Sequence, residues 1–240
     1  DVDLLVLLDD ALLSEAQRLK INTAVEGWLG SLWDMGLAPS HSVRTVAECL
    51  AFCHEDLASE TAVLEARFLA GDEGLFQRFS QQFFANFDLQ AFWRNKVAEM
   101  RARYARFEET PFSLEPNCKE SPGGLRDLHL MLWLSKAAHL AQSWEDLHDI
   151  GWLNQKQARL IVRCETLLLA IRAHLHILTR RPENRLLFDL QASLAQAFGL
   201  SDDDGKLASE LLMQKYYIAA RVNSVRMSLF LQKFDEYMAP

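Results

Sequence analysis

The chain has 240 residues, enough for one large domain or two smaller ones, and half of them are hydrophobic. Its formal net charge of −8 argues against a protein that holds nucleic acid through a broad basic surface. No signal peptide is recognised and no apolar run is long enough to span a bilayer, so we expect a cytoplasmic protein without a membrane anchor. Glycine and proline are scarce, with 10 and 6 residues, which favours a mostly helical chain.

The four cysteines lack the spacing of a zinc site. Cys49, Cys53 and Cys164 lie in stretches that are apolar and helical in pattern, and Cys118 does not. We interpret all of them as reduced thiols of a cytosolic protein.

The first eight residues begin with two acids and continue as an aliphatic run. In a β-strand Asp1 and Asp3 point to the same side, and residues 5–8 are apolar enough to predict a buried strand. Two adjacent carboxylates repel each other unless a cation neutralises them, and Mg²⁺ prefers oxygen ligands. The alternative is a solvated pair of acids, and these residues alone do not decide. Because the chain begins on this strand, we expect it to be a fragment.

A helix follows the strand. It is predicted to begin at Ser14, a good N-cap, and to end near Gly36. Residues 37–45 predict a second strand, after which Thr45 caps another helix. A strand, a helix and a strand with short links form a small α/β unit.

From residue 56 onward we find only helical patterns. The predicted helices are residues 57–69, 75–83, 91–107, 125–140, 155–179, 186–198 and 206–237. Residues 110–122 are irregular and rich in proline. Helices with polar outer faces and short joins describe a bundle. We therefore predict an α+β chain that is predominantly α, with one part at residues 1–87 and a helical bundle at residues 88–240.

Residues 91–107 carry a basic face, which we interpret as a solvated side of the helix. Its members are Arg94, Lys96, Arg101, Arg103 and Arg106.

A glycine pair marks the next helix start. Gly123 and Gly124 can bring free N–H groups close to an anion, and Lys119 and Arg126 flank them with positive charge. Asp127 lies in the first helical turn, where an acid suits the helix dipole. The alternative is an ordinary Pro-Gly-Gly turn that caps the helix.

A second basic segment, residues 180–189, contains three arginines, among them Arg185. It could contact a nucleotide or order the join between two helices, and the sequence does not separate these possibilities.

Seven motifs are spread over the chain in order. They are Asp1–Leu5, Trp33–Leu37, His41–Thr45, Leu64–Arg67, Glu115–Asn117, Pro122–Asp127 and Asn184–Asp189. Together they resemble the bacterial PII uridylyltransferase/uridylyl-removing enzymes. The resemblance implies a nucleotidyltransferase domain of the DNA polymerase β type, a helical domain, an HD hydrolase domain and two glutamine-sensing ACT domains. Residues 1–87 would be the later part of the first domain, and residues 88–240 the helical domain.

The resemblance also implies a reaction, in which UMP passes from UTP to a tyrosine of the PII signal protein and pyrophosphate is released. Asp1 and Asp3 would be the catalytic acids that bind Mg²⁺. Glutamine would act only through domains outside this chain. The residues expected near the nucleotide are Lys119, Gly123, Gly124, Arg126, Asp127 and Arg185.

Two departures from the family's pattern leave alternatives open. The glycine-rich turn expected before the Asp-x-Asp strand is absent from this sequence, and the second strand carries no acid. Asp56 is the nearest candidate for a third metal ligand. The alternatives are an enzyme like the glutamine synthetase adenylyltransferase, or a non-catalytic nucleotide-sensing module, which the missing acid favours.

Overall fold

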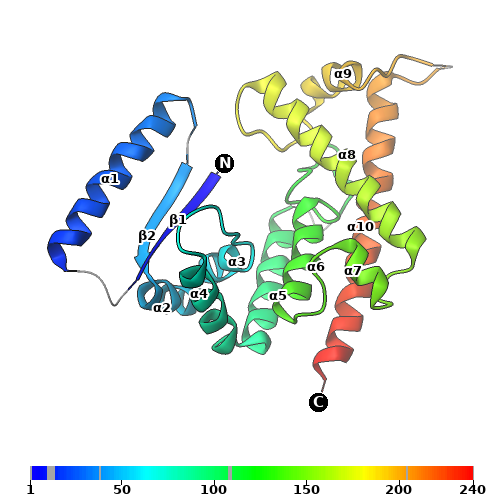
Figure 1. Ribbon diagram of the computed structural model, residues 1–240. Helices are drawn as coiled ribbons and strands as arrows, with labels where there is room; N and C mark the ends of the chain where they lie inside the picture. Colours follow the sequence, from blue (N-terminus) through cyan, green and yellow to red (C-terminus); the bar gives the residue numbers. More distant parts are fainter. Residues whose placement is uncertain (1, 10–13, 38, 108–109, 204, 240) are drawn as a thin grey trace. The chain divides into compact units, whose positions relative to one another are not determined.

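The computed structural model describes residues 2–9, 14–37, 39–107, 110–203 and 205–239. The chain separates into two compact units, residues 1–88 and 89–240, called unit 1 and unit 2 below (Figure 1). Unit 1 contains strands and helices, whereas the described elements of unit 2 are helices. The α+β, predominantly α fold that the sequence predicted is therefore confirmed.

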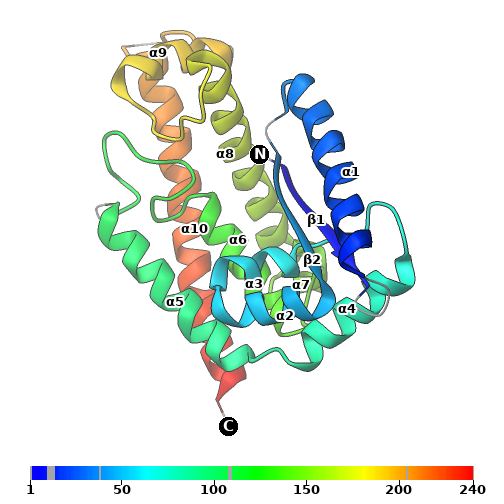
Figure 2. The ribbon, with the colours of Figure 1, turned by 90° about the vertical axis from the view of Figure 1, so that its left-hand side faces the viewer.

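Unit 1 is built on a parallel pair of strands. β1 (Val2–Leu8) pairs with β2 (Pro39–Thr45), and Asp3 lies opposite Ser40. Parallel strands need a long crossover, which α1 (Glu15–Asp34) supplies. Figure 2 shows α1 running alongside the two strands.

The first two helices begin where the local sequence predicts. The Ser14 side chain accepts the N–H of Gln17, whose side chain accepts the N–H of Ser14 in return, so that both N–H groups are satisfied. Thr45 and Glu48 form the same capping box at α2 (Val46–Glu55). The predictions of Ser14 and Thr45 as N-caps are confirmed.

Two further helices complete the described part of unit 1, namely α3 (Leu57–Leu64) and α4 (Glu73–Ala85). The sequence predicted a helix reaching Leu69, but α3 ends at Leu64. Of the two apolar residues beyond it, Phe68 packs on α4, where its ring centre lies 6.0 Å from that of Phe76, whereas Leu69 is 66% exposed. The apolar spacing therefore extended the predicted helix beyond its actual end.

The predicted burial of β1 is right at Leu8 and wrong at Leu5. The side chain of Leu8 is buried, whereas Leu5 is 38% exposed. Among the described residues the sheet has two strands, so each strand keeps an unpaired edge. An aliphatic run predicts burial only where neighbouring elements cover both faces.

Unit 2 is a helical bundle whose longest element, α10, packs against α6, α8 and α9 (Figures 1 and 2). Its helices are α5 (Leu89–Arg106), α6 (Leu125–Ala137), α7 (Trp144–Asp149), α8 (Gln155–Thr179), α9 (Phe188–Ala197) and α10 (Ala208–Met238). The sequence did not predict α7, because six residues are too few to show a helical period. α8 and α10 have 25 and 31 residues, but within the described ranges no helix is both long and apolar enough to cross a membrane.

The core of unit 2 joins its helices to the segment before α6. Leu168 and Ile171 of α8 and Leu212 of α10 are fully buried in one cluster, together with Cys118 and Leu125. Each such aliphatic side chain contributes about 1.5–3 kcal/mol on burial. All four cysteines are buried free thiols, as the sequence predicted.

Candidate functional site

The segment that precedes α6 folds into a tight loop, here called the cationic loop (residues 116–127). The Asn117 side-chain oxygen accepts the N–H groups of Lys119 and Glu120 at 3.0 and 2.9 Å. The Arg126 N–H donates to the Lys119 carbonyl at 2.9 Å. The loop therefore fixes Lys119 and Arg126 next to each other at the start of the helix.

The two glycines have a packing role in this loop. Gly123 has a φ of +78°, and a Cβ on it would lie 2.0 Å from the carbonyl oxygen of Ala220. Its N–H donates to Asp127 Oδ2 at 2.6 Å, and the Gly124 N–H donates to the Ser121 carbonyl at 2.8 Å. The prediction that this turn offers free N–H groups to an anion is therefore wrong, because the chain's own oxygens accept them.

Asp127 is an internal part of the loop. Its side chain is fully buried, and its carboxylate accepts from Arg103 Nη2 and the Tyr104 hydroxyl, each at 2.6 Å, as well as from the Gly123 N–H. Burial, followed by the Asp127 charge, raises the pKa of Tyr104, which keeps this hydroxyl a donor. We correct the expectation that Asp127 meets a nucleotide: a buried acid with three donors stabilises the loop.

The basic face of α5 is also only partly solvated. Lys96 and Arg103 are buried, with 3% and 8% of their surface exposed. Lys96 Nζ lies 2.6 Å from Glu99 and 4.6 Å from the ring centre of Trp133 on α6. The interpretation of a solvated side is wrong at these two positions, because their charged groups contact carboxylates and an aromatic ring instead of water.

Lys119 and Arg126 remain partly exposed, with 26% and 30% of their side chains accessible. Both lie near one acid, Glu120, at 3.9 and 3.4 Å. Burial lowers the pKa of Lys119 below its usual 10.5, and the charges of Arg126 and Arg172 lower it further, against the opposite effect of Glu120. Two partly exposed cations thus lie beside one acid, as a site for an anion requires.

The second basic segment lies against the cationic loop. Asn117 and Arg185 form an antiparallel bridge, and the Cys118 N–H donates to the Asn184 carbonyl at 2.8 Å. Arg185 is exposed, and its N–H donates to Glu183 Oε1 at 2.9 Å. The structure thus brings together two segments that the sequence indicated separately. Nucleotide contact by Lys119, Arg126 and Arg185 stays a prediction.

Sequence reasoning missed one cation of this region, Arg172. It extends from α8, and its Nε donates to Asn184 Oδ1 at 2.8 Å. No short motif surrounds Arg172, so its position in the fold was the only signal that could have found it.

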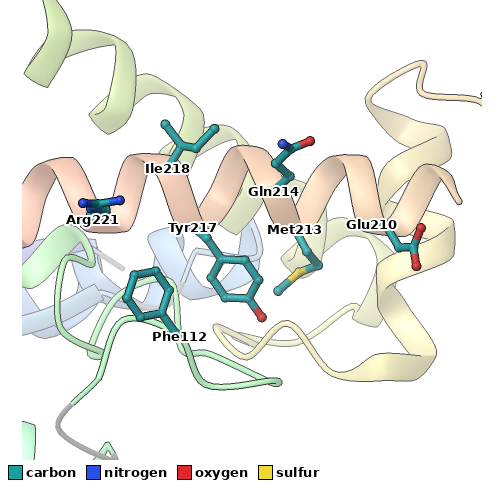
Figure 3. Close-up of a pocket in the computed structure, with 7 residues that line it drawn as sticks. All are labelled: Phe112, Glu210, Met213, Gln214, Tyr217, Ile218 and Arg221. Atoms are coloured by element: carbon teal, nitrogen blue, oxygen red, sulfur yellow. The ribbon is translucent and has the colours of Figure 1, made fainter. Parts of the chain in front are cut away.

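Side chains of α10 also form hydrogen bonds to the irregular segment before α6. Asn223 Nδ2 donates to the Gly123 carbonyl, and the Tyr217 hydroxyl donates to the Ser113 carbonyl, each at 3.0 Å. The rings of Phe112 and Tyr217 lie 6.0 Å apart, and both line an open pocket of about 430 Å³ (Figure 3). The cations of the loop do not line this pocket. Its lining residues are Phe112, Glu210, Met213, Gln214, Tyr217, Ile218 and Arg221.

The predicted metal ligands belong to unit 1. Asp1 lies outside the described residues. Asp3 is exposed, and its carboxylate accepts from the Ser40 hydroxyl on the neighbouring strand, which leaves oxygen capacity that fits Mg²⁺. Asp56 is the N-cap of α3, and bonds from Ser59 to its carboxylate lower its pKa. Among the described residues no group of three or more His, Cys, Asp or Glu is placed to hold a metal ion.

The comparisons with known proteins first give the class of protein. The family model described as "GlnD PII-uridylyltransferase" matches residues 91–230, most of unit 2, and the chain belongs to this family. The resemblance stated from the sequence motifs is therefore confirmed.

The curated relatives then give particular proteins. Over all 240 residues the chain is 45% identical to the bifunctional uridylyltransferase/uridylyl-removing enzyme of Bordetella avium (strain 197N). It is 42% identical to the enzyme of the same name from Burkholderia pseudomallei (strain K96243). In each case the chain spans 27% of the relative's length. No solved structure matches the chain.

Proposed function

We propose that this chain is part of an enzyme that transfers UMP from UTP to a tyrosine hydroxyl of the PII nitrogen-signalling protein, with release of pyrophosphate. Family membership and the names of the relatives support the uridylyltransferase reaction. The observation that carries the proposal is the excess of cations at Lys119 and Arg126, which share a single acid. A nucleoside triphosphate supplies the negative charge that such a site lacks.

Unit 1 would be the later part of the nucleotidyltransferase domain. Asp1 and Asp3 would hold Mg²⁺, with Asp56 as a candidate third ligand. A metal ion bound there would neutralise charge on the phosphates and help to activate the tyrosine hydroxyl. The exposed Asp3 carboxylate supports this assignment, and the Ser40 hydroxyl fixes its orientation.

Unit 2 would be the helical domain that contributes phosphate contacts. Lys119 and Arg126 would bind phosphate oxygens, and Arg185 would contact the phosphate or the base. The buried Asp127 supports both cations indirectly, since it holds the loop in one shape. Glutamine sensing and removal of UMP would belong to parts of the protein outside this chain, and we propose a cytoplasmic location.

The whole protein tests the proposal when it is incubated with labelled UTP, Mg²⁺ and PII. We expect label on PII, loss of that label in the double variant Asp1→Ala with Asp3→Ala, and a marked decrease in Lys119→Gln with Arg126→Gln. The matched control is Arg163→Gln, an exposed arginine of α8 outside the cationic loop. An unlabelled PII with the wild-type protein would refute the proposal.

A second candidate is a nucleotide-binding module without transfer activity. The observation in its favour is that β2 carries no acid beside Asp3, where a further metal ligand could stand. UTP binding that persists without Mg²⁺ in the double aspartate variant, with no transfer by the wild type, would support it.

A further inference from the structure

Arg172 of α8 points toward the segment that the cationic loop contacts, and neither the motifs nor the family resemblance gives it a role. We propose that Arg172 is a third cation of the phosphate site, that Asn184 positions it, and that it acts in binding the triphosphate. The proposal rests on the function proposed above and adds a residue to its substrate site.

Asn184 joins Arg172 to the cationic loop through two hydrogen bonds. Its side-chain oxygen accepts from Arg172 Nε at 2.8 Å, and its main-chain carbonyl accepts from the Cys118 N–H, also at 2.8 Å. Cys118 directly precedes Lys119. Arg172 and Lys119 are therefore fixed through the side chain and the main chain of the same residue.

The chemistry of arginine also fixes the orientation of the Asn184 amide. An arginine nitrogen only donates, so the atom that faces Arg172 Nε is the oxygen Oδ1. His176 Nε2 lies 3.3 Å from the same oxygen and must therefore carry a hydrogen to bond to it. Two donors on one oxygen hold the Asn184 side chain in place.

The Arg172 guanidinium keeps its terminal nitrogens for a ligand. Its Nε is used by Asn184, and within the described part of the chain Nη1 and Nη2 have no hydrogen-bond or ion-pair partner. Two parallel N–H groups are the arrangement with which arginine binds phosphate oxygens.

The acids of this region are already engaged. Glu183 accepts the N–H groups of Asn184 and Arg185 and pairs with Arg181 at 2.9 Å. Glu120 is shared by the two cations of the loop. Burial lowers the pKa of Lys119, and the charges of Arg126 and Arg172 lower it further. An anion bound between them would relieve their mutual repulsion.

Two variants of the whole protein test the assignment, Arg172→Gln and Asn184→Ala. We expect the KM for UTP and the inhibition constant of pyrophosphate to rise about tenfold, as for the loss of one charged phosphate contact. The KM for PII and kcat should stay within about twofold, and Arg172→Lys should recover part of the affinity. Arg163→Gln on the exposed side of α8 is the control and should match the wild type.

Calorimetric binding of tripolyphosphate to the 240-residue chain separates this inference from the proposed function, because it requires no transfer. Weaker binding in Arg172→Gln than in Arg163→Gln supports the third cation even if the wild-type protein labels no PII. Equal binding in these two variants, with weaker binding in Lys119→Gln, would overturn it. So would a lower kcat in Arg172→Gln with unchanged KM and unchanged pyrophosphate inhibition, since that result indicates a purely structural role.

Discussion

Asp3 in unit 1 and Asp127 in unit 2 both lie near the start of an element for which the motifs predicted a functional role. Asp3 is exposed and has a hydroxyl partner on the next strand. Asp127 is fully buried, and three donors from the protein engage its carboxylate. Acids at similar motif positions can therefore have different roles. Asp127 stabilises the fold, whereas Asp3 remains accessible to a ligand.

The largest expected effect tests the close packing around Asp127. Gly123→Ala would place a Cβ 2.0 Å from the Ala220 carbonyl oxygen, so α10 and the loop must separate. We expect a loss of roughly 3 kcal/mol or more in the free energy of unfolding. Hydrogen exchange of the α10 amides would measure it.

Gly151→Ala is a matched control for that variant. Gly151 has a φ of +74°, close to the +78° of Gly123, but nothing lies within 4 Å of its missing Cβ. The backbone strain alone should cost about 1 kcal/mol. Equal losses in the two variants would contradict the packing role of Gly123.

The next effect concerns the buried ion pair. Asp127→Asn keeps the shape of the side chain but leaves the buried Arg103 without its carboxylate at 2.6 Å. We expect a loss of about 3 kcal/mol in stability, because the buried Arg103 then keeps only the more distant Glu120 carboxylate, at 3.9 Å. Urea unfolding of the chain would measure it, and a loss below about 1 kcal/mol would show that Glu120 or water replaces Asp127.

A smaller effect concerns the charge on Lys119. Its pKa is lowered below 10.5 by burial and by the charges of Arg126 and Arg172, and Glu120 acts in the opposite direction. Burial raises the pKa of the neighbouring Cys118 thiol to about 12. Bound tripolyphosphate favours the charged ammonium, so binding should be coupled to proton uptake and should weaken as pH rises through the lowered pKa.

Calorimetry in two buffers of different ionisation enthalpy would detect this proton uptake. We expect the affinity to fall as the pH is raised through the lowered pKa of Lys119 toward 10.5. Lys119→Arg should remove the dependence, since a guanidinium stays charged. A pH dependence that survives this substitution would assign it to another group.

The smallest expected effect on stability concerns the exposed acid, Asp3. Asp3→Asn should change the free energy of unfolding by no more than about 0.5 kcal/mol, because an exposed carboxylate is replaced by an amide of the same shape. The same substitution is expected to abolish label transfer by the whole protein. A stability loss like that of Asp127→Asn would mean that the fold needs the Asp3 charge.

The sequence predicted features that depend on neighbouring residues better than features that depend on distant ones. Ser14 and Thr45 were correct as N-caps because their partners lie three residues away. The predicted burial of Leu5 was wrong, because burial there depends on which elements cover the sheet. The packing role of Gly123 was not predicted, since the atom that excludes a side chain there belongs to Ala220 on α10.

The cationic site was predictable in part for the same reason. Lys119 and Arg126 were found because they flank a glycine turn in the sequence. Arg172 lacks such a signal, and only the packing of α8 against the loop places it there. Sequence patterns identify a site's local residues, while residues supplied by distant helices require the fold.

The hydrogen bond from Asn223 to the Gly123 carbonyl joins residues 100 positions apart. During synthesis on the ribosome, Lys119 and Arg126 therefore emerge long before the helix that holds their loop in shape. Closing so long a segment costs conformational entropy that packing of α10 must offset. We expect a nascent chain that stops before α10 to bind phosphate ligands poorly at this loop, so that nucleotide is engaged only after the bundle has closed.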